Sequence, residues 1–170
     1  LGIAPLTATP NSIMIDGGAT LANTTTLTLN SNRGIGLNNT GTVNVAAGTT
    51  LRYDGIISDN GGMGTFGIGG TGTLYLNGVS NYTGVTTMTS TGLVTTNSLA
   101  NGGVNSGIGA SGSASSNLIF NSGASTVGAQ AGLNYNGTAS VSTDRLFEIA
   151  NNTNNAGARI QANGANNASL

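Results

Sequence analysis

Residues 66–78 read FGIGGTGTLYLNG and contain two patterns that predict different proteins. Gly67, Gly69 and Gly72 have the G-x-G-x-x-G spacing of a dinucleotide-binding loop, whereas TLYL at 73–76 alternates like a β-strand. A dinucleotide-binding loop needs a helix directly after it and an acidic residue about 20 positions further on. The chain has a strand-like segment after these glycines and no acidic residue near that distance. The stretch therefore predicts a turn before a short strand, with no phosphate site.

The composition of the 170 residues excludes several classes of protein. Only 5% are charged, against roughly 25% in ordinary globular proteins, and there are 29 Gly but no His, Cys or Trp. A formal net charge of -1 gives no electrostatic reason to bind nucleic acid or an anionic membrane. No apolar run approaches the roughly 20 residues of a membrane helix. We therefore predict no cofactor, no metal, no nucleic-acid partner and no direct membrane insertion.

Short apolar segments recur along the chain between polar turns, which favours an ordered protein over a disordered one. These segments are SIMI (12–15), TLTL (26–29), GIGL (34–37), TVNV (42–45), TLRY (50–53), GIIS (55–58), TFGI (65–68), TLYL (73–76), VTTM (85–88), TGLV (91–94), NLIF (117–120), GLNY (132–135), RLFEI (145–149) and ARI (158–160). In the first half they start about 8 residues apart, and three per turn give a period of about 24, which is typical of a solenoid.

The spacing predicts an all-β fold, a parallel β-helix of about seven coils with three short strands each. Alternate side chains of each strand point into the core. Leu27 and Leu29 are expected to face inward and Thr28 outward, and the same pattern places Leu74 and Leu76 inside with Tyr75 outside.

Asparagine and glycine are expected at the corners, because both tolerate a positive φ and stacked Asn side chains can form amide ladders. Because Asn-Gly also marks two-residue hairpins, an antiparallel sandwich or barrel stays open as an alternative. The pairs are Asn77-Gly78, Asn101-Gly102, Asn136-Gly137 and Asn163-Gly164.

One region breaks the regular pattern. Residues 99–116, LANGGVNSGIGASGSASS, are rich in small side chains and predict a loop that bulges from the helix, with a flexible linker as the alternative. The chain starts at Leu1, and its last residues resemble the start of a new strand. We expect residues 1–170 to be a single β-helix segment, either an excerpt of a larger secreted protein or a repeat unit in one.

The segment GGTGTLYLNGVSNYTGVTTMTSTGLV (69–94) resembles the autotransporter-associated β-strand repeat: a glycine-rich lead, a T-L-x-L strand and the Tyr82-Thr83-Gly84 corner. Val85 departs from the family, which usually has Gly there. Residues 32–62, 99–124 and 142–150 resemble the flanks of that repeat. The resemblance implies a right-handed parallel β-helix in the passenger of a secreted bacterial surface protein, and the repeat carries no chemistry of its own.

Candidate catalytic residues are few, and we assign none. Arg52, Asp54 and Asp59 form the densest polar group, and some β-helix polysaccharide lyases use acids to bind Ca²⁺ with a basic residue to abstract a proton. Because Arg52 and Asp54 are both even-numbered in an extended segment, they can share a face, and a surface ion pair is the simpler interpretation. Asp144 is expected to cap a corner, and Arg145 to pair with Glu148 or with the next coil.

Two further surfaces are open to interpretation. The Thr-x-Thr spacing in TTTLTL and TTMTST is used for ice binding when it repeats on one face of many coils, but outward Thr is also an ordinary strand residue. Exposed aromatic rings can bind sugars, and the candidates are Tyr53, Tyr75, Tyr82 and Tyr135. At least one of these is expected to pack in a corner.

These observations predict a structural and interaction module without catalytic activity, secreted or on the bacterial cell surface. It would form an adhesin-type stalk or a fibre. The expected partners are flanking β-helix coils, identical subunits stacked end to end, or host-cell, neighbouring-cell and glycan surfaces. The alternatives are a self-stacking filament subunit and, with less support, a polysaccharide-degrading enzyme or an ice-binding solenoid.

Overall fold

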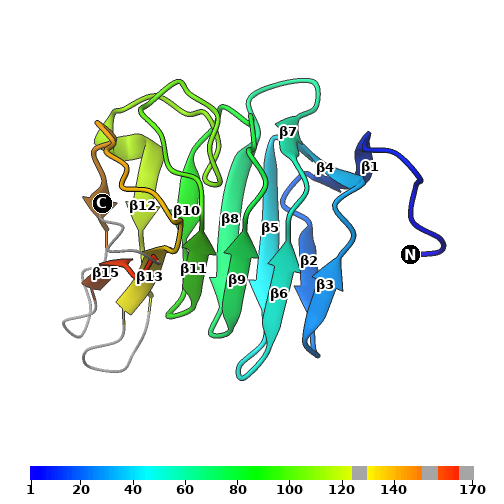
Figure 1. Cartoon of the computed structure of the whole chain (residues 1–170), viewed down its shortest axis with the longest axis horizontal. Coiled ribbons are helices and arrows are strands. Elements are labelled where there is room, and N and C mark those ends of the chain that lie inside the picture. Colours follow the sequence, from blue (N-terminus) through cyan, green and yellow to red (C-terminus); the bar gives the residue numbers. More distant parts are fainter. Residues whose placement is uncertain (124–129, 151–156, 165–170) are drawn as a thin grey trace.

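The computed structural model describes residues 1–123, 130–150 and 157–164 and shows a parallel β-solenoid (Figure 1). The described residues form fifteen strands, and their helical content is one 3-10 turn, η1 (Ser115–Asn117). This confirms the all-β solenoid predicted from the spacing of the apolar segments. All strand pairs are parallel, so the antiparallel sandwich or barrel is excluded.

The strands form three walls. The first wall is a short sheet of β1 (Thr9–Asp16), β4 (Arg33–Asn38) and β7 (Ile57–Asp59). The second wall contains β2 (Thr20–Asn23), β5 (Thr40–Val45), β8 (Thr65–Gly70), β10 (Thr86–Met88), β12 (Leu118–Phe120) and β14 (Glu148–Ile149). The third wall contains β3 (Leu27–Leu29), β6 (Thr50–Tyr53), β9 (Thr73–Leu76), β11 (Leu93–Thr96), β13 (Gln130–Tyr135) and β15 (Gly157–Ala162).

The solenoid has about six turns, close to the seven predicted. Ile13 pairs with Ile35 and Ile35 with Ile57, so the first coils repeat every 22 residues. Between Val94 and Leu133, which also pair, the step is 39 residues. The longer step contains residues 99–116, and it explains why a constant period of about 24 overestimates the number of coils.

The core is made of columns of apolar side chains that run along the solenoid axis. One column joins one residue from each strand of the third wall: Leu27, Leu51, Leu74, Val94, Leu133 and Ile160. A second column does the same in the second wall: Leu21, Val43, Ile68, Met88, Phe120 and Ile149. Each inner member is buried because coils cover it on both sides.

The predicted alternation holds in β9, where Leu74 and Leu76 are buried and Tyr75 lies on the outer face. The predicted orientation also holds in β3, where Leu27 and Leu29 pair with the buried Leu51 and Tyr53, although Leu27 is 42% exposed. The reason is its place in the stack: β3 is an edge strand, and among the described residues only β6 pairs with it.

The first wall ends at β7, and loops close the solenoid from the fourth coil onward (Figure 1). Residues 99–116 form such a loop, and they pack against the preceding coil instead of bulging outward. Ser80 and Ser106 exchange backbone hydrogen bonds of 2.9 and 3.2 Å in an isolated antiparallel bridge. Ile108 is buried in the core. The loop therefore takes the place of a strand of the first wall.

Candidate functional site

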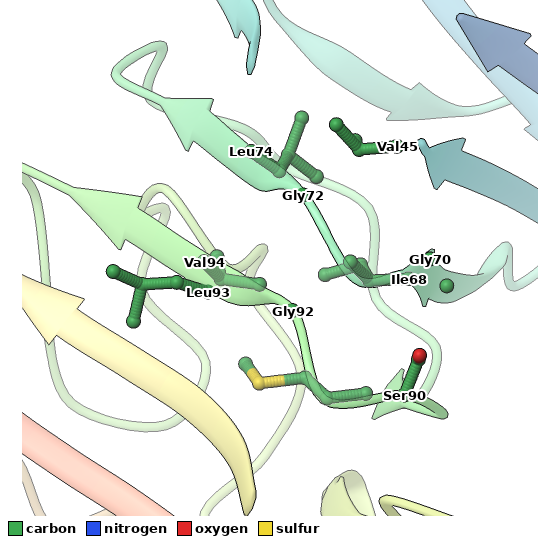
Figure 2. A pocket seen from close by; sticks show the side chains of 11 residues that line it. Val45, Ile68, Gly70, Gly72, Leu74, Ser90, Gly92, Leu93 and Val94 are labelled. Atoms are coloured by element: carbon green, nitrogen blue, oxygen red, sulfur yellow. The ribbon is translucent and has the colours of Figure 1, made fainter. Parts of the chain in front are cut away.

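The glycines of FGIGGTGTLYLNG form a corner between two walls. Gly67 and Gly69 lie in β8, and the chain enters β9 directly after Gly72. Figure 2 shows the hollow beside this corner, which Ile68, Gly72 and Val94 help to line. Its volume is about 10 Å³, roughly enough for one water molecule. In the described ranges no helix starts after these glycines, because the strand β9 follows, so the corner is not an anion site of the dinucleotide-binding type.

Close contact between coils explains why glycine is needed at this corner. Gly70 has a φ of +81°, and a Cβ there would collide with the carbonyl oxygen of Val45 one coil earlier. The Gly72 amide donates to that same oxygen at 3.0 Å, and the Gly72 carbonyl accepts from Leu93 at 3.1 Å. The glycines therefore let the backbones of successive coils hydrogen-bond at a turn.

Arg52 and Asp54 share a face, as their spacing predicted. Arg52 Nε donates to Asp54 Oδ2 at 3.0 Å, and the guanidinium lies 5.9 Å from the centre of the Tyr75 ring. Asn77 Nδ2 donates to the other carboxylate oxygen of Asp54 at 2.9 Å. One oxygen of Asp54 therefore accepts a bond from its own coil and the other accepts one from the next coil, which supports a structural role.

Asp54 belongs to a corner column that runs the length of the solenoid. The residue directly after each strand of the third wall is Asn or Asp, and Gly or Ser comes next. The pairs are Asn30-Ser31, Asp54-Gly55, Asn77-Gly78, Asn97-Ser98, Asn136-Gly137 and Asn163-Gly164. We name these six pairs the Asn corner. The sequence predicted three of them as corners, but Asn101-Gly102 lies elsewhere, in the loop 99–116.

The predicted reason for glycine in these pairs is wrong. In the Asn corner, Gly55, Gly78 and Gly137 do not have a positive φ. Instead, a Cβ at Gly78 would collide with the carbonyl oxygen of Gly55 one coil earlier, and one at Gly137 would collide with the ring of Tyr135. A lack of space therefore selects the small residue, beside the previous coil at Gly78 and beside a tyrosine ring of the same coil at Gly137.

Asp59 is committed to another corner. Its Oδ2 accepts from Thr83 Oγ1 at 2.6 Å, and its Oδ1 accepts from the Gly64 amide at 2.7 Å. The Thr83 amide also donates to the carboxylate, at 3.1 Å to each oxygen. Since Thr83 lies one coil later than Asp59, this carboxylate joins consecutive coils at the Tyr-Thr-Gly corner.

Asp144 and Arg145 hold the loop 99–116 in place. Asp144 Oδ1 accepts from the Gly102 amide at 2.7 Å. The Arg145 side chain donates to four acceptors of the loop: Ala100 O at 3.1 Å, Val104 O at 3.2 Å, Gly109 O at 2.9 Å and Ser111 Oγ at 2.9 Å. We call this pair of residues the clasp. It matches the predicted capping role of Asp144.

Arg145 is an unusual cation because it is almost fully buried and its described hydrogen bonds go to neutral oxygens. Burial lowers its pKa, while the nearby Tyr82 and Asp144 act in the opposite direction. The expected pairing with Glu148 is absent: Arg52–Asp54 is the ion pair in the described part of the chain. Glu148 lies exposed in β14.

Three of the four tyrosines are corner residues and not a sugar-binding surface. Tyr53, Tyr82 and Tyr135 are buried. The Tyr53 hydroxyl donates to the carbonyls of Arg33 and Ile56 at 2.7 and 3.0 Å. Tyr82 bonds Thr86, and Tyr135 donates to Ala139. Burial raises the pKa of both Tyr53 and Tyr82 above the usual range. Only Tyr75 lies on the outer face.

The described walls do not carry the continuous rows of outward threonine that ice binding needs. Thr28 pairs with Arg52, which pairs with Tyr75, so the Thr-x-Thr of the first coil does not continue. Thr87 lies between Gly67 and Ile119 in the second wall. Thr28 and Thr87 therefore lie on outer faces without a threonine beside them in the paired strands.

The two ends of the solenoid expose apolar side chains, and others are exposed along its length, among them Ile56, Met63 and Val79. In the described part of the chain, no group of three or more His, Cys, Asp or Glu residues is placed to hold a metal ion. The end residues are Leu1, Ile3, Leu6, Met14 and Leu27 at one end, and Leu146, Phe147, Ile149 and Ile160 at the other. Large exposed apolar surfaces usually mark interaction sites, so these exposed side chains are candidate contact residues.

Comparison of the chain with models of protein families, with curated proteins and with solved structures gave no match in any of the three. No helix among the described residues is long and apolar enough to cross a bilayer. The fold defines a class, the parallel β-solenoids, and the function must be argued from the surfaces described above.

Proposed function

We propose that the chain is a structural and interaction module, a β-solenoid segment of a secreted bacterial surface protein that forms an adhesin-type stalk or fibre. The proposal rests on one observation: the charged side chains of the candidate groups form structural contacts. Asp54, Asp59, Asp144 and Arg145 all make hydrogen bonds that join neighbouring coils or hold the covering loop. These bonds stiffen a rod, and they commit these four side chains to structural contacts.

The bacterial surface location rests on the resemblance to the autotransporter-associated repeat. The structure supports it through the corners that the repeat implies: the glycine-rich lead before β9 and the Tyr82-Thr83-Gly84 corner that Asp59 caps. Because these features build coils and carry no chemistry, they fit a stalk that holds binding regions away from the cell.

Surface labelling tests this location directly. An antibody raised against the 170-residue chain is applied to intact and to permeabilised cells that produce the protein. We expect labelling of intact cells, and loss of the label after brief protease treatment of the cell surface. Labelling that needs permeabilisation would refute the proposal.

A second test addresses catalysis. The purified chain is incubated with bacterial and plant polysaccharides, and new reducing or unsaturated ends are measured. We expect no turnover. Turnover that Asp54→Ala abolishes, while Arg159→Ala retains it, would replace the stalk with a polysaccharide-degrading enzyme.

A further inference from the structure

We propose that Asn101 and Gly102 form a self-modification site, at which the Asn101 side chain cyclises onto the backbone and is converted to aspartate and isoaspartate. The inference goes beyond the proposed function and does not depend on it. Asn101-Gly102 lies outside the Asn corner, in the loop 99–116. The Asn101 side chain is exposed, so water can reach it.

Asp144 contacts both reacting groups of this pair. Its Oδ1 accepts a hydrogen bond from the Gly102 amide at 2.7 Å, and its backbone amide donates to Asn101 Oδ1 at 3.1 Å. The Gly102 nitrogen is the atom that attacks the side-chain carbonyl in such a cyclisation. A carboxylate at hydrogen-bond distance from the proton to be removed is placed as a general base. A donor at the carbonyl oxygen stabilises the negative charge that develops there.

The cyclisation balances without any other reagent. The Gly102 nitrogen forms a bond to Asn101 Cγ while its proton passes to Asp144 Oδ1, and negative charge collects on Asn101 Oδ1. The bond from Cγ to Nδ2 then breaks, and the proton passes from Asp144 to Nδ2, so that ammonia leaves. The product is a succinimide ring. Water opens the ring at either carbonyl and gives aspartate or isoaspartate.

The clasp holds the two partners next to each other. Thr143 Oγ1 and Arg145 Nε both donate to Ala100 O, at 2.9 and 3.1 Å, so the residues that flank Asp144 bind the residue before Asn101. Gly102 is also fixed by packing, because a Cβ there would collide with the backbone of Ser113. Fewer degrees of freedom therefore have to be frozen before the attack.

Other Asn-Gly pairs in the described part of the chain are arranged differently. The side-chain oxygens of Asn77 and Asn136 are buried without a hydrogen-bond partner. Asn60-Gly61 is a closer match, since Asn60 Oδ1 accepts a side-chain hydrogen bond at 2.9 Å and Gly61 is exposed. The neighbouring carboxylate of Asp59, however, accepts from other amides. Comparison of Asn101 with Asn60 therefore isolates the effect of the Asp144 carboxylate.

The product should loosen the clasp. Aspartate or isoaspartate at position 101 sets a second carboxylate beside Asp144, and the two negative charges repel each other. Isoaspartate also lengthens the backbone of the loop by one carbon. The modification therefore acts as a slow, irreversible release of the loop 99–116. The amides of Ser106 and Ala110 bond to the preceding coil, so their hydrogen exchange should speed up as the product forms.

Peptide mapping by mass spectrometry tests the proposal on the folded 170-residue chain, incubated at neutral pH. We expect Asn101 to lose ammonia and then to gain water, at a rate that exceeds those at Asn60, Asn77 and Asn136 by at least about tenfold. Asn101 should also react faster in the folded chain than in the same chain unfolded in urea, because only the fold brings Asp144 to it. An equal or slower rate in the folded chain would overturn the proposal.

Asp144→Asn removes the base but keeps an oxygen that can accept from the Gly102 amide. The rate at Asn101 should fall by at least about tenfold. Asp54→Asn is the matched control, since Asp54 accepts from Asn77 in another corner, and it should leave the rate at Asn101 unchanged. An unchanged or higher rate in Asp144→Asn would refute the role of the carboxylate. Hydrogen exchange at Ser106 and Ala110 checks that the loop stays closed in this variant; if it opens, the comparison of folded and unfolded chains decides without any substitution.

Discussion

Removing the Arg145 guanidinium tests whether the clasp holds the loop 99–116. In Arg145→Met, the methylene stem is largely kept, but four hydrogen bonds to the loop are lost. At about 1 kcal/mol net for each bond, the gross loss is about 4 kcal/mol. Part of this is offset, because the variant no longer buries a charge. We therefore expect the free energy of unfolding to fall by about 3 kcal/mol.

The acceptors left behind refine this estimate. Ala100 O keeps a hydrogen bond from Thr143 Oγ1, and Gly109 O keeps one from Ser106 Oγ. Ser111 is buried, so its hydroxyl loses a donor that water cannot easily replace. The loss of unfolding free energy should therefore be smaller than if every acceptor were left without a hydrogen bond. The destabilisation should be concentrated in the loop.

Urea unfolding measures the global effect, and hydrogen exchange locates it. The amides of Ser106 and Ala110 bond to the preceding coil, so their protection reports on the loop. We expect both to lose protection in Arg145→Met while β5 and β8 keep theirs. Arg52→Met is the matched control, since its ion pair is half exposed and contributes about 0–1 kcal/mol. A loss below about 0.5 kcal/mol in Arg145→Met, with unchanged exchange, would refute the clasp.

Three further predictions concern the corners. Gly70→Ala should lower the free energy of unfolding by more than about 2 kcal/mol, because the new Cβ would collide with the backbone of the previous coil. Gly103→Ala is the control, since Gly103 has the same φ of +81° but open space around it. In the same urea assay it should cost about 1 kcal/mol. Asp54→Asn should change the free energy of unfolding by less than about 1 kcal/mol, because the amide oxygen can still accept from Asn77 and the lost ion pair is exposed. Burial raises the folded-state pKa of Tyr53 above its unfolded value of 10.0. The contribution of Tyr53 to the free energy of unfolding is therefore fully present below pH 10 and is lost as the pH rises further. Unfolding measured across this pH range should show a smaller loss of stability in Tyr53→Phe than in the unmodified chain.

The sequence predicted the fold well because a short solenoid strand leaves a local signal. TLYL at 73–76 and TVNV at 42–45 show the strict alternation of a wall whose inner side is buried, and both are strands. The strand β2 (Thr20–Asn23) was missed because Leu21 is its only large apolar residue. RLFEI was expected as a strand over residues 145–149, but only Glu148 and Ile149 are in β14.

The clasp could be predicted only in part, because its geometry depends on contacts far apart in the chain. The capping role of Asp144 followed from its residue type, but its partner Gly102 lies 42 residues earlier. An arginine normally signals a surface ion pair, so the sequence placed Arg145 beside Glu148. Its burial among carbonyl oxygens follows from where the loop 99–116 folds, which no local pattern encodes.

The two halves of the solenoid are closed by different interactions. In the first three coils, parallel strands form all three walls, so backbone ladders carry the stack. From the fourth coil, the first wall is replaced by loops, and side chains such as Asp59 and Arg145 supply the cross-links. Backbone ladders can form with any further parallel strand, whereas side-chain cross-links need particular residues. The second and third walls run through all six turns of the described residues, so their backbone ladders carry the stack along its whole length.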